Sequence, residues 1–163
     1  LLTGLPNRFL FMDRFEQAVQ QHIRNGNSFA LLLLDLDHFK EINDQYGHEV
    51  GDAVLVESAR RMTGEIRACD TVARHGGDEF VVLLANTLDN SDALAVAEKL
   101  RQAIAQPLES ADRRLSITPS IGVAMYPADG KTLDDLRRAA DEAMYEAKKN
   151  GRNAVSGFRQ AAG

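Results

Sequence analysis

The chain has 163 residues, 44% of them hydrophobic, which is enough for one well-buried core and too little for two domains. Its formal charge of −5 and pI near 5.4 argue against a general nucleic-acid-binding protein, because such a protein carries a basic surface. Cys69 has no second cysteine to pair with, and neither a signal peptide nor a long apolar span is present. We therefore expect one domain over residues 1–163, a piece of a longer protein, in a reducing cytoplasm without membrane contact of its own.

Hydrophobic periodicity predicts helices alternating with strands. In chain order, the patterns predict a helix over residues 7–24, a strand over 29–35 buried on both faces, a short helix or turn over 38–46, a helix over 49–68, strands over 71–73 and 80–84, a helix over 90–104, a strand pattern over 115–126, a helix from Thr132 to just before Gly151, and a short strand over 153–158. Pro119 interrupts the long strand pattern and lacks a ladder donor, so we expect it at a sheet edge or a bulge. The alternation has no strict parallel rhythm, which indicates an α/β (α+β) fold with a mixed sheet covered by helices.

The turn between the two strands around residue 76 carries more than a turn requires. Gly76 and Gly77 permit the positive φ values of a tight hairpin, and they let a ligand approach the backbone without meeting a Cβ. Asp78 and Glu79 follow at once, where a buried strand should begin. Taken alone, the pentapeptide of residues 76–80 fits an ordinary hairpin turn followed by solvated acids equally well.

A second buried strand also ends in acids, at Asp35-Leu36-Asp37. With a period of two, Asp35 and Asp37 point to one face and the Leu36 side chain to the other, which leaves the Leu36 carbonyl near the carboxylates. Hard oxygen ligands of this kind suit Mg²⁺ or Mn²⁺ and not zinc. Two acidic strand ends therefore predict a divalent-cation site.

Six segments together carry a resemblance to a known family. They are residues 2–8 (LTGLPNR), 35–44 (DLDHFKEIND), 47–52 (GHEVGD), 74–80 (RHGGDEF), 120–124 (SIGVA) and 147–154 (AKKNGRNA). In this order and spacing the chain resembles a GGDEF domain, of the diguanylate cyclase family, over nearly its whole length. The resemblance implies a mainly antiparallel five-stranded sheet flanked by helices, related to the nucleotidyl cyclase and polymerase palm. It also implies an origin in a bacterial signalling protein.

The implied reaction joins two GTP molecules into cyclic di-GMP and releases two pyrophosphates. By the same resemblance, Asp35, the Leu36 carbonyl and Asp78 hold Mg²⁺ or Mn²⁺, and Asp78 accepts the proton of the attacking hydroxyl, with Glu79 an open alternative. Lys40 resembles the lysine that stabilises the transition state, although a lysine of this kind is ordinarily solvated.

The substrate contacts follow from matched positions. Asn43, His48 and Asp52 resemble the guanine-side residues, and a carboxylate that accepts from guanine N1 and N2 is selective because adenine lacks these donors. Gly76 and Gly77 would form the floor under the nucleotide, and Lys148 and Arg152 would contact its β- and γ-phosphates. Helix capping is the alternative for Asn43, His48 and Asp52, and complementing a helix dipole is the alternative for the two cations.

Arg67 and Asp70 form an Arg-x-x-Asp five residues before Gly76, which is the spacing of the family's inhibitory product site. Arg101 is a weaker candidate for a second contact from a neighbouring subunit, and a surface charge pair is the bland alternative for the motif. Because one domain holds one GTP, the reaction implies a transient homodimer across the active face. The competing hypotheses are a non-catalytic cyclic di-GMP receptor and a nucleotidyl cyclase or polymerase-like enzyme with another base preference.

Overall fold

The structure, a computed structural model, describes residues 2–110 and 112–158. The single domain expected over 1–163 thus includes residue 1, residue 111 and residues 159–163, which lie outside the described part. The helices are α1 (Arg8–Asn25), α2 (Phe39–Tyr46), α3 (His48–Glu65), α4 (Asn90–Ala105) and α5 (Leu133–Lys149). The strands are β1 (Phe29–Leu36), β2 (Thr71–Gly76), β3 (Glu79–Leu84), β4 (Leu108–Ser110), β5 (Arg113–Leu115), β6 (Pro119–Tyr126) and β7 (Ala154–Gly157).

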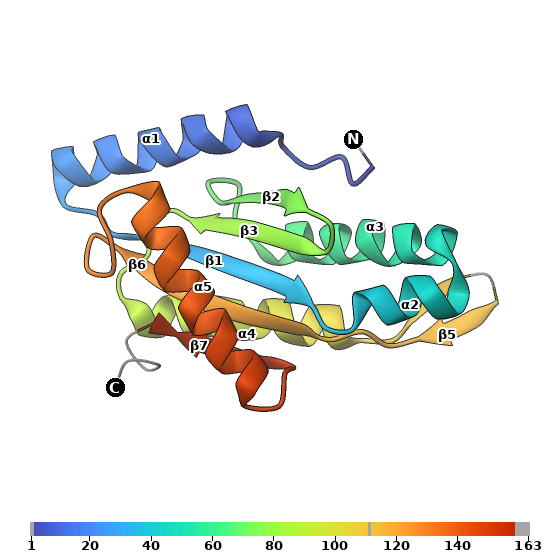
Figure 1. Ribbon diagram of the computed structural model, residues 1–163. Helices are drawn as coiled ribbons and strands as arrows, with labels where there is room; N and C mark the ends of the chain where they lie inside the picture. Colours follow the sequence, from blue (N-terminus) through green and yellow to red (C-terminus); the bar gives the residue numbers. More distant parts are fainter. Residues whose placement is uncertain (1, 111, 159–163) are drawn as a thin grey trace.

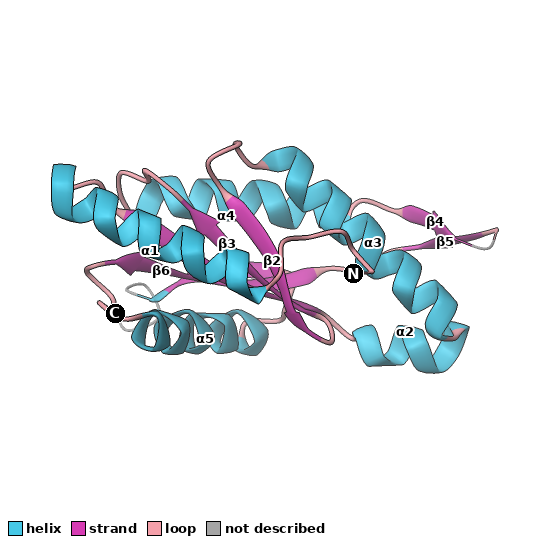
Figure 2. Cartoon of the chain, turned by 90° about the horizontal axis from the view of Figure 1, so that it is seen from above, coloured by secondary structure: helices cyan, strands magenta, loops and turns pink. Residues whose placement is uncertain are grey.

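A five-stranded sheet of order β2-β3-β1-β6-β7 forms the centre of the molecule. The pairs β2–β3, β3–β1 and β1–β6 are antiparallel, and β6–β7 is parallel. Helices cover both faces (Figure 1), and the view from above shows α1 and α5 on one side of the sheet and α3 and α4 on the other (Figure 2). The expected mixed, mainly antiparallel sheet flanked by helices is confirmed.

The central strand β1 is buried on both faces, as its continuous apolar pattern predicts. Ala30, Leu32, Leu34 and Leu36 belong to the core beneath α3 and α4, whereas Phe29, Leu31 and Leu33 belong to the core beneath α1 and α5. Because neighbours along a strand point to opposite faces, one apolar segment serves both cores. The last residues of β1 are therefore fixed in position where the sheet ends.

Helix α5 lies unusually close to β6 because Gly122 has no side chain. A Cβ on Gly122 would lie 2.0 Å from the Ala140 carbonyl oxygen and 2.3 Å from the Met144 nitrogen. The backbones therefore touch here, which a larger residue would prevent. This contact sets the height of α5 above the sheet and with it the position of Lys148 in the helix's last turn.

Three local expectations need correction. Helix α3 ends at Glu65 and not near residue 68, because the Arg67–Asp70 turn takes up the chain beyond it. The pattern over 115–126 divides into β5 and β6, and β5 pairs with the unpredicted β4 in a separate two-stranded hairpin. Pro119 lies at neither a sheet edge nor a bulge; it is the first residue of the inner strand β6, opposite Leu36, where a missing donor is also tolerated.

Candidate active site

The two acidic strand ends meet because β1 and β3 are antiparallel neighbours. Asp35 lies opposite Glu79 in the ladder, and the Leu36 N–H donates to the Asp78 carbonyl over 3.2 Å. Gly77 has a φ of +53°, and Arg74 clamps the turn by donating to the Gly77 carbonyl from Nε at 3.0 Å and Nη2 at 2.7 Å. The hairpin thus holds its acids next to the end of β1.

The two carboxylate oxygens of Asp35 differ in their surroundings: one binds a cationic side chain and the other has no partner. Its Oδ2 accepts from Lys148 Nζ at 2.5 Å, although the two residues are 113 positions apart. Its Oδ1 is buried and has no hydrogen-bond partner within the described part of the chain. Because an unsatisfied buried carboxylate oxygen is costly, a further positive ligand here would be favourable.

The carboxyls beside Asp35 hold their protons more tightly than free acids do. Burial, followed by a hydrogen bond that the protonated acid can donate to Asp35 and by the charge of Asp35, raises the pKa of Asp78 from 3.8 to about 6. Burial also raises the pKa of Glu79; the charges of Asp35 and Asp141 act in the same direction, while His75 and Arg137 oppose them. Like charges in one partly dry site repel one another, and the Lys148 ammonium, which lowers the pKa of Asp78, does not fully offset this repulsion.

The donor set fits a hard divalent cation. It offers only oxygen atoms, it contains an unpartnered buried carboxylate oxygen on Asp35, and Asp78 resists ionisation beside it. No three His, Cys, Asp or Glu side chains converge on one point among the described residues, so a cation would need the backbone, water or nucleotide oxygens as well. This requirement is typical of Mg²⁺ bound together with phosphates.

Asp37 does not join this cluster. Its side chain accepts from Thr118 Oγ1 and Ser120 Oγ, both at 2.7 Å, and from the Asn153 N–H at 3.0 Å. The residue is only 5% exposed. The sequence pattern placed Asp35 and Asp37 on one face, but β1 ends at Leu36, and Asp37 ties the strand end to two other segments.

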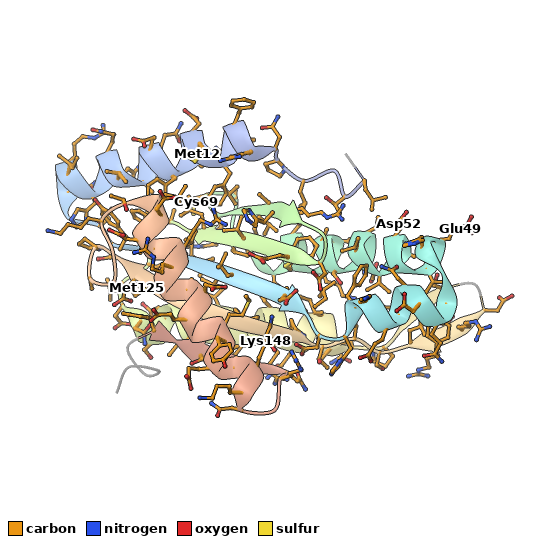
Figure 3. The ribbon with its side chains drawn as sticks, viewed as in Figure 1. Met12, Glu49, Asp52, Cys69, Met125 and Lys148 are labelled. Carbon is orange, nitrogen blue, oxygen red and sulfur yellow. The ribbon has the colours of Figure 1, made fainter. Side chains whose placement is uncertain are left out.

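The residues expected on the guanine side, Asn43, His48 and Asp52, lie around the start of α3. A Cβ on Gly51 would lie 1.7 Å from Asn43 Oδ1, so the amide of Asn43 rests in the space that the glycine leaves. Asp52 follows in the first turns of α3, and Figure 3 labels it on that helix and Lys148 on α5. His48 is the first residue of α3 and is exposed, as is Lys40 in α2.

Arg152 lies just beyond α5, in a turn with unusual backbone geometry. Residues 151 to 153 have φ values of +103°, +63° and +45°, and the Arg152 N–H donates to the Ala147 carbonyl at 3.1 Å. Arg152 itself is exposed. Lys148 and Arg152 therefore come from one helix end, and the Lys148 ammonium already reaches the end of β1.

The Arg-x-x-Asp motif is a compact turn in which the two side chains bind each other. Asp70, whose side chain is 2% exposed, accepts from the Arg67 backbone N–H at 3.0 Å, from Arg67 Nη2 at 3.1 Å and from the Ala85 N–H at 3.0 Å. Arg67 also donates to the Ala85 carbonyl, and its side chain is 55% exposed. Asp70 thus anchors the turn, while Arg67 faces solvent.

Within the chain, Arg101 connects α4 to the segment beyond α5. It donates from Nε and Nη2 to Glu98, at 2.7 and 2.6 Å, and from Nη1 to Asn153 Oδ1 at 2.8 Å. Sequence reasoning gave Asn153 no functional role, counted Asp37 with Asp35 among the acids of the predicted cation site, and did not place Asp141 near Glu79. Asn153 lies within one of the recognised segments, which was the only signal available for it.

Comparisons with protein families, with curated sequences and with solved structures all identify relatives of this chain. The family model "Diguanylate cyclase, GGDEF domain" matches residues 1–154. The bifunctional diguanylate cyclase/cyclic di-GMP phosphodiesterase MucR of Pseudomonas aeruginosa is 49% identical over 98% of this chain, which spans 23% of MucR. The solved GGDEF domain of TpbB from the same species superimposes with a TM-score of 0.91 at 41% identity, covering 95% of this chain and 97% of that one. The GGDEF domain of DgcB from Caulobacter crescentus, solved in complex with c-di-GMP, gives 0.89 at 30% identity, covering 98% and 94%.

The sheet and its paired acidic strand ends define a nucleotidyl-cyclase-like domain of the palm type. More narrowly, the chain belongs to the GGDEF domain family of diguanylate cyclases. Among the described residues no helix is long and apolar enough to cross a membrane. The chain spans less than a quarter of the length of MucR.

Proposed function

We propose that this domain condenses two GTP molecules into cyclic di-GMP and two pyrophosphates, with Mg²⁺ or Mn²⁺, in the cytoplasm. The observation that carries the proposal is the meeting of Asp35, at the end of β1, with Asp78, in the turn before β3, while Lys148 binds Asp35 from α5. Two acids held together without a packing purpose need positive charge, and the divalent cation that accompanies a nucleoside triphosphate supplies it where phosphoryl chemistry occurs.

In this mechanism the 3′-hydroxyl of one GTP attacks the α-phosphorus of the other, and pyrophosphate leaves. Asp35, the Leu36 carbonyl and Asp78 would hold the divalent ion, which when bound stabilises the charge on the phosphate oxygens. A carboxylate must take the hydroxyl proton, and a group whose pKa lies near the working pH does this well. Asp78 is the first candidate for that role, and Glu79 is the second.

The other residues orient the nucleotide. Beside His48, the amide of Asn43 would pair with the guanine edge and the carboxylate of Asp52 would accept from guanine N1 and N2. A site built for guanine rejects adenine, because adenine leaves the polar groups of the site unpaired. Gly76 and Gly77 leave the hairpin backbone open to the nucleotide. Lys148 and Arg152 would contact the β- and γ-phosphates, and Lys40 would neutralise charge in the transition state. When GTP enters, Lys148 exchanges Asp35 for phosphate.

One domain holds one nucleotide in this scheme, so two copies must face each other across their hairpins in a transient, isologous dimer. We also propose feedback by the product at Arg67. Arg67 uses its Nε and Nη2 on Asp70 and on the Ala85 carbonyl, so the solvent-facing Nη1 edge of its guanidinium would donate to phosphate or guanine. The buried Asp70 holds the guanidinium in that orientation and does not itself touch the ligand. The DgcB domain with bound c-di-GMP supports a product site in this family.

Incubation of the domain with GTP and Mg²⁺, with mass identification of the product, tests the proposal. Asp35→Asn and Asp78→Asn should lose turnover while keeping a native circular dichroism spectrum. Asp44→Asn, a change at an exposed acid of α2, should keep it. Near-native turnover in either site variant would refute the metal assignment. Binding of cyclic di-GMP without any turnover by the unmodified domain would instead favour the receptor hypothesis.

A further inference from the structure

The turn after α5 comprises residues 150–153, and we call it the phosphate turn. Its backbone conformation is one that residues other than glycine rarely adopt. Gly151, Arg152 and Asn153 follow one another with positive φ values of +103°, +63° and +45°. Glycine accepts such values, but Arg and Asn adopt them only sparingly. Strained residues of this kind persist where surrounding contacts hold them, and they cluster at functional sites.

Two side chains hold the strained end of the phosphate turn at Asn153. The Asn153 N–H donates to Asp37 Oδ2 at 3.0 Å, and Asp37 is itself fixed by Thr118 and Ser120. From the other side, Arg101 Nη1 donates to Asn153 Oδ1 at 2.8 Å across 52 positions of sequence. The backbone between these contacts and the end of α5 carries Arg152.

The guanidinium of Arg101 is itself held in place. Glu98, one turn earlier on α4, accepts from Arg101 Nε at 2.7 Å and from Nη2 at 2.6 Å. This fork fixes the plane of the guanidinium, so that the remaining nitrogen Nη1 points at Asn153. A preorganised donor of this kind loses little entropy when it binds.

We propose that Arg101 is a positioning residue for substrate, which acts through Asn153 to hold the phosphate turn and so to aim Arg152 at the triphosphate. This inference rests on the proposed function, from which it takes the contacts of Lys148 and Arg152 with the β- and γ-phosphates. It gives Arg101 a role within its own domain, through its partners Glu98 and Asn153, in place of the contact with a neighbouring subunit's product that the sequence suggested.

A matched pair of variants tests the proposal. Arg60 binds Glu57 with the same fork, Nε to Oε1 at 2.8 Å and Nη2 to Oε2 at 2.6 Å, but among the described residues it makes no hydrogen bond to a distant segment. Arg101→Ala should weaken binding of a non-hydrolysable GTP analogue about tenfold, or about 1.4 kcal/mol. It should leave binding of GMP, which has the same base and no β- or γ-phosphate, unchanged. Arg60→Ala should change neither affinity.

A double-mutant cycle identifies the route. Asn153→Gly removes the acceptor without adding strain at a positive φ, and Arg101→Ala should then cost little more, because residues that act through one contact are not additive. Inhibition by cyclic di-GMP should have the same midpoint in Arg101→Ala as in the unmodified domain when GTP is held at each protein's own KM.

Other results would overturn the inference. These are equal losses of affinity for GMP and the GTP analogue, fully additive effects of the two variants, or resistance to cyclic di-GMP with unchanged GTP affinity. Because the affinities need no turnover, the two proposals can fail separately. An unmodified domain that makes product, with an unchanged ratio of affinities in Arg101→Ala, would refute only this inference. A domain that binds the analogue as described and makes no product would refute only the cyclase proposal.

Discussion

Asp78→Asn should stabilise the metal-free domain at neutral pH. The folded protein raises the pKa of Asp78 from 3.8 to about 6, first through burial and then through Asp35. For an acid whose pKa is raised on folding, the folded state binds the proton more tightly than the unfolded state does. The free energy of unfolding therefore falls as pH rises from about 4 to about 6, and this loss stays in place above that window.

The size of the effect follows from the same values. The difference between 3.8 and about 6 corresponds to about 3 kcal/mol at full weight, since one pKa unit is about 1.4 kcal/mol. The side chain is only partly buried, so solvent screening reduces this to about 1–2 kcal/mol. For a domain of this size such a change raises the melting temperature by roughly 3–6 °C.

Thermal unfolding in a chelating buffer at pH 4, 5, 6 and 7.5 measures the difference between Asp78→Asn and the unmodified domain. We expect a difference near zero at pH 4 that grows to its full value by pH 7. Glu57 also makes stability depend on pH, because Arg60 and Arg61 lower its pKa to about 2. Its contribution is lost as pH falls below about 4.5, but it is the same in both proteins and cancels in the difference. Asp44→Asn is the control. A difference that stays flat with pH, or a less stable Asp78→Asn at pH 7.5, would refute the reasoning.

Three further predictions concern packing, inhibition and assembly. Gly122→Ala should destabilise the domain by about 3 kcal/mol or more, because the new Cβ would meet the α5 backbone at 2.0 Å and neither element can yield; urea unfolding measures it, and a loss below about 1 kcal/mol would contradict that contact. Arg67→Ala should resist cyclic di-GMP while keeping its initial rate, and it should also unfold earlier because Arg67 holds the turn at Asp70 and Ala85; unchanged inhibition would make the motif a structural turn only. Specific activity should rise with enzyme concentration, and fusion to a dimerising coiled coil should raise it further; a flat value over a hundredfold dilution would refute the two-domain reaction.

Features with a local cause could be predicted from the sequence. The apolar run of β1 predicted a strand buried on both faces, and the pair Gly76 and Gly77 predicted the hairpin. The helix predicted from Thr132 onward is α5, and Thr132 caps it, because its Oγ1 accepts from the Asp135 N–H at 3.1 Å. These features depend on φ preferences, on the period of the side chains and on contacts within about four residues. All three can be read from a short stretch of sequence.

Features that depend on distant contacts were decided only by the tertiary structure. Asp35 and Asp37 look equivalent in sequence. The register of β1 against β6 nevertheless places Asp37 where it accepts hydrogen bonds from Thr118, Ser120 and Asn153. The same packing brings Lys148 to Asp35. The sequence gave no sign that Arg101 contacts Asn153, which the fold places beside it. Each of these pairings joins residues at least 52 positions apart, and such a contact forms only when the whole sheet and its helices have set the distance between the two side chains.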